Sequence, residues 1–282
     1  MKKRLMTVVA VVLSAILMLG ITSCGPKNTA VTYADIALSD ELYGYCVKPD
    51  DTDLLKSVND LIAEIKENGK LTELYNAEMD KTAGDIGTVK TKSENRSEEL
   101  VVATNADFAP WEYFKGSNFA GIDMQIAKLL AEKLNKTLVV VHMDFDAVIL
   151  SVGNGQCDIG MAGLTISEKR SENVVFSNAY YDASQCIAYK EGDERFTSCK
   201  TAKDVVTVLK GLTQAKGGAA IGQTGEKYLK GDDDFSFEGF PNIKVNSYDS
   251  IALAVRDLSN GNVDFVVGDR DTIKFVVAGI NG

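Results

Sequence analysis

From residue 100 onward, short apolar strands alternate with amphipathic helices, and this alternation constrains the fold more than any other feature of the chain. The run Leu100–Ala103 is typical of a buried strand, and a polar and aromatic loop follows it as far as Glu112. The segment Gly121–Leu134 has the apolar spacing of a helix, and Thr137–Val141 is again strand-like. Such alternation favours an α/β protein whose sheets are covered by helices on both faces.

The alternation forms two successive units. In the first, a helix is predicted at Phe145–Val152 and strands at Asp158–Ala162, Val174–Phe176 and Gln185–Tyr189. In the second, helices are predicted at Thr201–Lys210, Asp249–Leu258 and Thr272–Val277, and strands at Ala219–Ile221, Ile243–Val245 and Val263–Val267. We therefore expect two lobes with a cleft between them. Open α/β sheets bind ligands beyond the carboxyl ends of their strands, so the loops at these ends are the candidate site.

The N-terminus has the pattern of an export signal. Three cationic residues at positions 2–4 precede an apolar run over 5–20, and small residues then lead to Cys24. The run is shorter than the roughly 20 residues that span a bilayer, which favours a signal over a transmembrane anchor. Small residues before a cysteine resemble a bacterial lipoprotein signal. That resemblance implies cleavage of residues 1–23, lipidation of Cys24, a tether at 24–27 and a lipid-anchored location on the extracellular face of the cell membrane.

Net charge and cysteine spacing limit the kinds of ligand that the chain can bind. The formal net charge is −10, and removal of the cationic start makes it more negative. Nucleic-acid binding needs clustered Lys and Arg, so we expect no such partner. No cysteine pair has metal-ligand spacing, and we expect neither a metal nor a cofactor. Apart from the lipidation candidate, the cysteines are Cys46, Cys157, Cys186 and Cys199. We expect most to be small core residues, with the last two as the favoured pair if a disulfide forms.

The segment before residue 100 has a different character. Val31–Leu38 and Leu42–Val47 are strand-like, Asp51–Gly69 is a strongly amphipathic helix and Lys70–Met79 is a second helix. Residues 80–98 contain few large apolar side chains and many charged or small ones. This composition predicts a polar linker or mobile loop.

Three loops that follow strands carry groups suited to a charged ligand. Gly and Thr at positions 163, 165, 224 and 225 offer backbone N–H groups and hydroxyls to a carboxylate. Arg170 can add a bidentate contact to the same carboxylate, and Asp269 can meet a cation. Phe108, Trp111 and Phe145 can form the walls. Together these groups suit a zwitterion.

Each of these groups also has an ordinary structural role. Gly163 to Thr165 can be a plain turn, Arg170 a solvated charge, and Asp269 the cap of the next helix. Phe108 and Phe145 can belong to the core, and His142 suits a strand-end surface position better than a catalytic one. Spacing alone does not choose between these interpretations.

Several stretches resemble the family-3 extracellular solute-binding proteins, the amino-acid-binding components of ABC importers. They are VVATNADFAPWEY, GIDMQIAKLLAEKL, MDFDAVILSV, CDIGMAGLTISEKR, VVFSNAYY, QTGEKY and VDFVVGDRDTIKFVV, which span 101–277 in the family's order. The resemblance implies an α/β fold of the two-lobed periplasmic-binding-protein type II (Venus flytrap). It implies that the lobes close on one free amino acid, which a monomer delivers to an ABC permease.

The resemblance also implies roles for single residues. Arg170 would hold the α-carboxylate with the backbone amides of Thr165 and Gly225, and Asp269 would take the α-ammonium with the Gly163 carbonyl. Asn105, Phe108, Trp111, Phe145 and Thr224 would face the ligand. The family often has an acidic residue at the position of Asn105. Its replacement here weakens the case for a basic ligand, and we expect a polar neutral or aromatic amino acid.

The order of the stretches is unusual. Residues 34–79 resemble the stretch that ordinarily closes the family's sequence, yet here they come first. This predicts a circular permutation, with residues 80–98 as the linker between the old termini. Lobe 1 would comprise 38–188, and lobe 2 would comprise 28–37 plus 189–282. The alternative is a fragment of a tandem array.

Two other functions stay open at this stage. Cyclic-acid dehydratases resemble the same fold, so an enzyme is one alternative, although no Ser-His-Asp or Cys-His set is visible. An amino-acid sensor is the other. The leading expectation is a binding protein rather than an enzyme.

Overall fold

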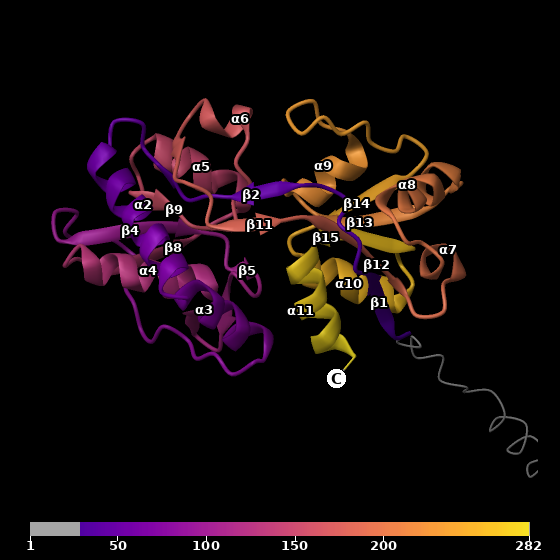
Figure 1. The fold of residues 1–282 in the computed structure, drawn as a ribbon, viewed down its shortest axis with the longest axis horizontal. Coiled ribbons are helices and arrows are strands. Elements are labelled where there is room, and N and C mark those ends of the chain that lie inside the picture. The colour runs from indigo at the N-terminus through magenta and orange to yellow at the C-terminus, as the bar shows by residue number, and fades with distance from the viewer. Residues whose placement is uncertain (1–28, 282) are drawn as a thin grey trace, which may run out of the picture.

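A computed structural model describes residues 29–281 of the chain. The expected signal peptide and the whole of the expected tether, including Cys24, lie outside these described residues. The described chain forms two lobes that lie side by side (Figure 1). Within it, no helix is both long and apolar enough to cross a membrane.

The first lobe is built on a five-stranded sheet with the strand order β10–β3–β9–β4–β8. These strands are β10 (Val175–Phe176), β3 (Cys46–Val47), β9 (Ile159–Gly160), β4 (Glu99–Thr104) and β8 (Thr137–His142). All residues of β4 are buried, and it runs parallel to both β8 and β9. Burial on both faces explains its continuous apolar run. Strand β3, from early in the chain, runs antiparallel between β9 and β10.

Helices cover both faces of this sheet. They are α2 (Thr52–Glu67), α3 (Lys70–Met79), α4 (Ile122–Lys133) and α5 (Phe145–Gly153), whereas the short α6 (Glu168–Ser171) buries no residue. The side chain of Asp51 caps α2 by accepting from the Leu54 amide at 3.1 Å. Alternate residues of β4 point to opposite faces, so Val102 packs with α2 and α4, whereas Val101 packs with α5.

A small antiparallel sheet stands where a loop was expected. It consists of β5 (Asp107–Phe108), β6 (Glu112–Lys115) and β7 (Asn118–Ala120).

The second lobe has a five-stranded sheet with the order β1–β12–β15–β13–β14. These strands are β1 (Val31–Ala34), β12 (Gln185–Lys190), β15 (Phe265–Asp269), β13 (Lys216–Ala220) and β14 (Lys244–Tyr248). Its helices are α7 (Glu194–Thr197), α8 (Ala202–Gly211), α9 (Thr224–Lys230), α10 (Ile251–Asn260) and α11 (Arg270–Ile280). Phe265 and Val267 pack with α8 and α9, whereas Val266 packs with α10 and α11.

Two chain crossings connect the lobes, and they lie side by side. Strands β2 (Glu41–Tyr43) and β11 (Tyr181–Ala183) pair antiparallel between the lobes (Figure 1). Next to them the Leu38 amide donates to the Gln185 carbonyl at 2.9 Å. The second crossing therefore lies at residue 184, four residues before the predicted boundary at 188/189, because β12 pairs with β1 and β15 along its length. Two adjacent crossings are the usual basis of a hinge.

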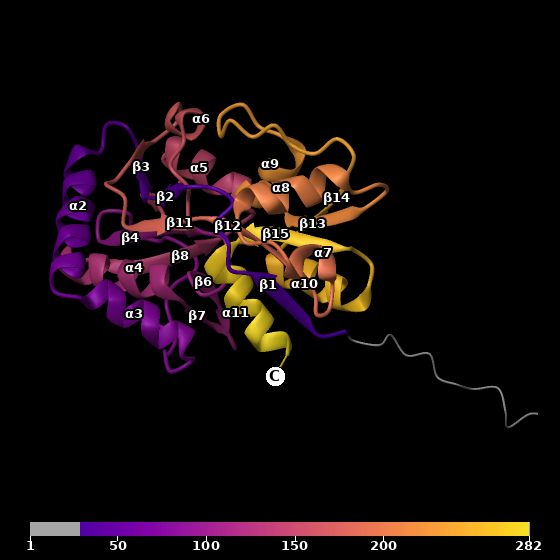
Figure 2. The same cartoon turned by 45° about the vertical axis from the view of Figure 1, so that its right-hand side comes forward.

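The two ends of the described chain lie together on the second lobe. Figure 2 shows β1 beside α11. The Asn281 side chain accepts from the Val31 amide at 3.2 Å and donates to the Val31 carbonyl at 2.7 Å. A short peptide is therefore enough to join these two ends.

The predicted mobile linker is instead packed along the first lobe. Ile86 is only 4% exposed, and its amide donates to the Phe119 carbonyl at 2.9 Å. Lys90 forms a parallel bridge with Val139 of β8, and Val89 packs against the core. Further on, the Glu99 side chain accepts hydrogen bonds from the Ser93 hydroxyl and from the backbone amides of residues 94 and 95. The prediction of mobility was wrong because one isoleucine and a sheet edge are enough to dock a polar segment.

The four described cysteines are all free and buried, so the favoured Cys186–Cys199 bridge is not formed. The described residues also contain no group of three or more His, Cys, Asp or Glu side chains placed to hold a metal ion.

Replacement of Ile86 by alanine should loosen the segment of residues 80–98. Removing a buried isoleucine side chain costs about 2–5 kcal/mol, and local detachment of the segment limits the loss. We expect faster tryptic cleavage at Lys81, Lys90 or Lys92, measured by mass spectrometry under native conditions. Thr88→Ala, at an exposed position of the same segment, is the matched control. Equal cleavage rates in both variants would show that Ile86 does not hold the segment.

Candidate functional site

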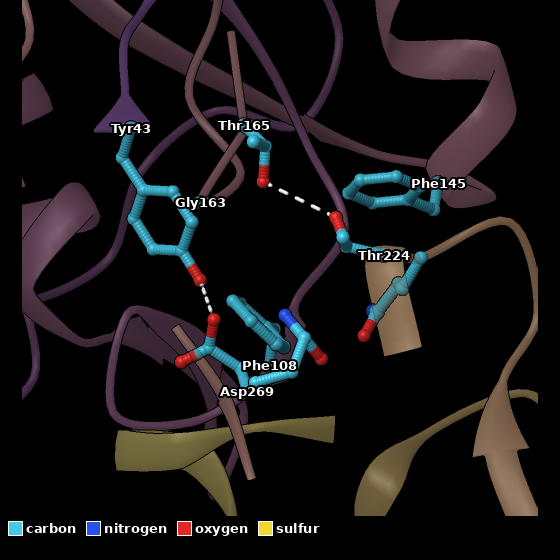
Figure 3. A pocket seen from close by; sticks show the side chains of 9 residues that line it. Tyr43, Phe108, Phe145, Gly163, Thr165, Thr224 and Asp269 are labelled. Carbon is cyan, nitrogen blue, oxygen red and sulfur yellow. Dashed lines mark hydrogen bonds between the residues drawn. The ribbon is translucent and has the colours of Figure 1, made fainter. Parts of the chain in front are cut away.

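The candidate site lies between the lobes, where side chains from both sheets converge (Figure 3). It is lined by Tyr43, Phe108, Phe145, Gly163, Thr165, Gln185, Gln223, Thr224 and Asp269. The cavity among them has a volume of about 10 Å³, which is about the space that one water molecule needs. An amino acid therefore enters only if the lobes move apart.

Asp269 is the acidic group of the cavity lining. It ends β15, is 4% exposed and accepts a hydrogen bond from the Tyr43 hydroxyl through Oδ2 (Figure 3). Its other oxygen, Oδ1, has no partner within the described chain. It makes no capping bond to α11, contrary to its possible role as a helix cap. Burial, and next the nearby charge of Glu41, raise the pKa of Asp269 well above its usual range. A cation at Oδ1 would stabilise the ionised carboxylate.

Tyr43 is a site residue that sequence reasoning missed. It belongs to the crossing strand β2 and lies 226 positions before Asp269 in the chain. Its ring packs edge-on against Trp111, with the centroids 5.3 Å apart. An apolar and aromatic strand gives no local signal that one of its residues faces a ligand. Gln185, at the start of the apolar strand β12, was missed for the same reason, whereas Gln223 belongs to a predicted candidate loop but was not given a ligand role.

The opposite end of the site carries hydroxyl groups. Thr165 from the first lobe and Thr224 from the second have their oxygens 3.2 Å apart. The Thr165 hydroxyl donates to Glu41 at 2.7 Å, and Gln185 donates to the same carboxylate at 3.0 Å. In this closed arrangement the Thr165 hydroxyl thus donates its hydrogen bond to a carboxylate of the protein itself. Glu41 was also missed from the sequence.

Arg170 lies behind these hydroxyls rather than in the lining. Its Nη1 donates to the Thr165 carbonyl at 2.7 Å. The guanidinium carbon stands 5.2 Å from the ring centroid of Phe145 and 5.8 Å from that of Phe235, which suits cation–π contacts. Gly225 is packed so tightly that a Cβ there would lie 2.6 Å from the Val267 carbonyl oxygen. Its place next to Thr224 therefore requires glycine.

The structure brings together six of the ten predicted ligand residues: Phe108, Phe145, Gly163, Thr165, Thr224 and Asp269. Gly225 and Arg170 flank this group. Trp111 does not line the cavity, because it is fully buried among Tyr43, Tyr180 and Tyr181. Asn105 lines a neighbouring, larger cavity.

Buried acids hold the Gly163 loop in place. Asp123 accepts bonds from the Gly163 amide at 3.0 Å, from Tyr45 at 3.0 Å and from Tyr180 at 3.1 Å. Glu112 lies next to Asp123, is fully buried and accepts from no donor group among the described residues, so its hydrogen bond is the one it shares with the Asp123 carboxyl group through a bound proton. Burial raises the pKa of Asp123 from 3.8 to about 6 and that of Glu112 well above its usual range. The folded protein therefore keeps protons on this pair that the unfolded chain releases.

Residues 100–236 match the model of the bacterial extracellular solute-binding proteins, family 3. The holo structure of ArgBP from T. maritima is 31% identical, with a TM-score of 0.54, over 65% of this chain and 74% of that one. The chain belongs to this family. The two lobes are therefore those of a type II periplasmic binding protein.

Two further relatives show the range of similarity. The arginine-binding extracellular protein ArtP of Bacillus subtilis (strain 168) is 35% identical over 42% of this chain and 46% of its own length. The match thus spans less than half of that relative. An ancestral amino-acid-binding protein, AncCDT-1, described as a precursor of cyclohexadienyl dehydratase, is 27% identical with a TM-score of 0.56 over 65% of this chain and 75% of its own.

Replacement of Glu112 by glutamine should make the protein more stable at neutral pH. Because the folded pKa of Asp123, about 6, lies above its ordinary 3.8 and that of Glu112 lies well above its ordinary 4.5, the free energy of unfolding falls as pH rises through this range, and the contribution of Glu112 begins near 4.5. The slope is about 1.4 kcal/mol per pH unit for each extra proton held. Glutamine does not titrate, so the substitution should flatten the dependence of the free energy of unfolding on pH.

Urea unfolding over a series of pH values measures the effect. Glu67→Gln, on the exposed face of α2, makes the same chemical change without burial and should leave the slope as it is. If Glu112→Gln keeps the wild-type pH dependence and stability, then the buried pair is not what holds the extra protons.

Proposed function

We propose that this protein captures an extracellular amino acid between its lobes and delivers it to an ABC importer. The observation that carries the proposal is the site between the lobes, where a buried carboxylate with one unpaired oxygen lies opposite hydroxyl groups backed by a guanidinium. These groups complement the ammonium and the carboxylate of an amino acid. The names of relatives that bind arginine support an amino-acid ligand.

In the bound state the α-ammonium would lie at Asp269 and the Gly163 carbonyl. The α-carboxylate would replace Glu41 as the acceptor of the Thr165 hydroxyl. It would also contact Arg170 and the Gly225 amide. Opening breaks the Thr165–Thr224 contact and separates Tyr43 from Asp269, and closure around a ligand replaces these contacts with contacts to the ligand. Such closure about the paired crossings would make binding and lobe closure a single event.

The polar neutral or aromatic side chain expected from the sequence stays a prediction. It rested on Asn105 and on aromatic walls, of which Trp111 does not reach the cavity. An enzyme on the same fold is the competing function. His142 does not favour it, because the ring lies outside the small cavity and its Nδ1 accepts from the Ala106 amide at 3.0 Å. Turnover of a bound ligand would decide for the enzyme.

We also propose that the chain is circularly permuted. Strand β3 completes the first sheet of its own chain, and the ends of the described chain meet at Val31 and Asn281. Both observations favour a permutation over a fragment of a tandem array. A lipid on Cys24 would then tether the second lobe to the membrane, because β1 belongs to that lobe.

Asp269→Asn and Arg170→Ala should each weaken amino-acid binding. Each change leaves one charge of the ligand without its partner in a site that closes, a loss of about 3–5 kcal/mol for a buried pair. A thermal-shift screen of the twenty amino acids identifies the ligand, and calorimetry then measures its Kd. The control is Asp60→Asn, on an exposed part of α2. Near wild-type affinity in both site variants would contradict the proposed ligand geometry.

A variant whose segments are rearranged into the family's usual order should fold and bind its ligand. It would start at Glu99, continue through Asn281, pass a short Gly/Ser linker to Thr29 and end at Glu98. Because all native contacts except the new join are kept, we expect an unchanged Kd and a change in unfolding free energy near 1 kcal/mol, the usual scale of loop-closure differences. Deletion of residues 29–79 without re-insertion should unfold the first lobe. A stable, binding-competent deletion variant would favour the tandem fragment.

A further inference from the structure

A second cavity adjoins the candidate site in the same cleft. It has a volume of about 440 Å³ and is lined by Asn105, Asp107, His142, Asp144, Phe145, Asp146, Ala147, Leu150, Ile221 and Asp249. Phe145 lines both cavities. Ile221 and Asp249 come from the second lobe and the others from the first, so this cavity also lies between the lobes. A side chain that starts at the small cavity can therefore pass Phe145 into the larger one.

The charge of the larger cavity has one sign. Four of its lining residues are aspartates, and none of the ten is a lysine or an arginine. Asp146 reaches the second lobe, because a Cβ on Gly222 would lie 2.4 Å from its Oδ1. Asp107 has its Oδ2 3.9 Å from Nε2 of His142, the sole potentially basic group of the lining. A concave surface with this charge attracts cations.

Asn105 gives an independent sign of a ligand. It is 6% exposed and lines this cavity. Its Nδ2 donates to the Met143 carbonyl at 2.9 Å, which fixes the orientation of the amide. The carbonyl oxygen Oδ1 then has no partner within the described chain. A buried acceptor without a donor is costly, and an N–H group of a ligand would satisfy it.

We propose that this cavity receives the cationic end of a ligand side chain, so that the ligand is a basic amino acid such as arginine or lysine. The proposal rests on the proposed function, because the α-ammonium and α-carboxylate must occupy the smaller site. The aliphatic part of the side chain packs on Phe145, an N–H donates to Asn105 Oδ1, and the positive charge lies among the aspartates. A neutral polar or aromatic side chain would leave these carboxylates without a counter-charge.

The pair arginine and citrulline tests the charge directly, because citrulline has nearly the same shape but carries a neutral urea group. Calorimetry on the wild-type protein should give an arginine Kd at least about tenfold lower than that of citrulline, equivalent to about 1.4 kcal/mol. Added salt should reduce this preference, because the aspartates are exposed to solvent. Equal affinities, or tighter binding of glutamine or phenylalanine, would overturn the proposal and leave amino-acid binding intact.

A double variant, Asp144→Asn with Asp146→Asn, tests whether the cavity supplies the preference. We expect arginine to bind about tenfold more weakly while citrulline binding hardly changes. The matched control is Asp50→Asn with Asp60→Asn, which removes two exposed aspartates on the far side of the first lobe. A uniform loss for both ligands would overturn the assignment of the cavity. If no amino acid binds the wild-type protein at all, the proposed function fails and this inference fails with it.

Discussion

The burial of Asp269 between the lobes is the constraint on which the site depends. A carboxylate removed from water needs hydrogen bonds or a counter-charge, and among the described residues the Tyr43 hydroxyl is the side-chain donor to one of its oxygens, while the other has no partner there. The closed structure therefore contains an incompletely satisfied acid at its centre. A ligand ammonium would donate to the second oxygen of Asp269, which Tyr43 does not reach. Burial of Asp269 therefore makes closure without ligand unfavourable and closure with ligand favourable.

Tyr43 connects this site to the hinge. It ends β2, the strand that pairs with β11 where the chain crosses between the lobes. Tyr181 of β11 and Tyr75 of α3 both donate to Asp271, two residues beyond Asp269. Movement of the second lobe therefore changes hydrogen bonds at the site and at the hinge together. This coupling favours two discrete lobe positions over a continuous range, because each position has its own set of bonds.

Much of the fold was predictable because its signals are local. The helix α3 and the apolar strands β4 and β8 follow from spacing and composition within a few neighbouring residues. The small sheet β5–β7 was missed because its strands are short and lie in a polar segment. Residues 80–98 were misjudged because docking through Ile86 depends on Phe119 and β8, partners that composition does not reveal. For residues 80–98 the deciding contacts thus lie outside the segment itself.

In the site, too, some residues were predictable from local sequence and others were not. Gly163, Thr165 and Thr224 follow strands or start helices, and the position of a residue at a strand end is readable from sequence. Whether an aromatic residue faces the ligand or the core is not, since Phe108 lines the cavity while Trp111, three residues later, is buried among tyrosines. Asn105 illustrates the point best. The resemblance implies that the family often has an acidic residue at this position, which argued against a basic ligand, yet in space four aspartates from other positions line the same cavity. The charge of a binding cavity is thus a property of its whole lining, and one substituted position does not determine it.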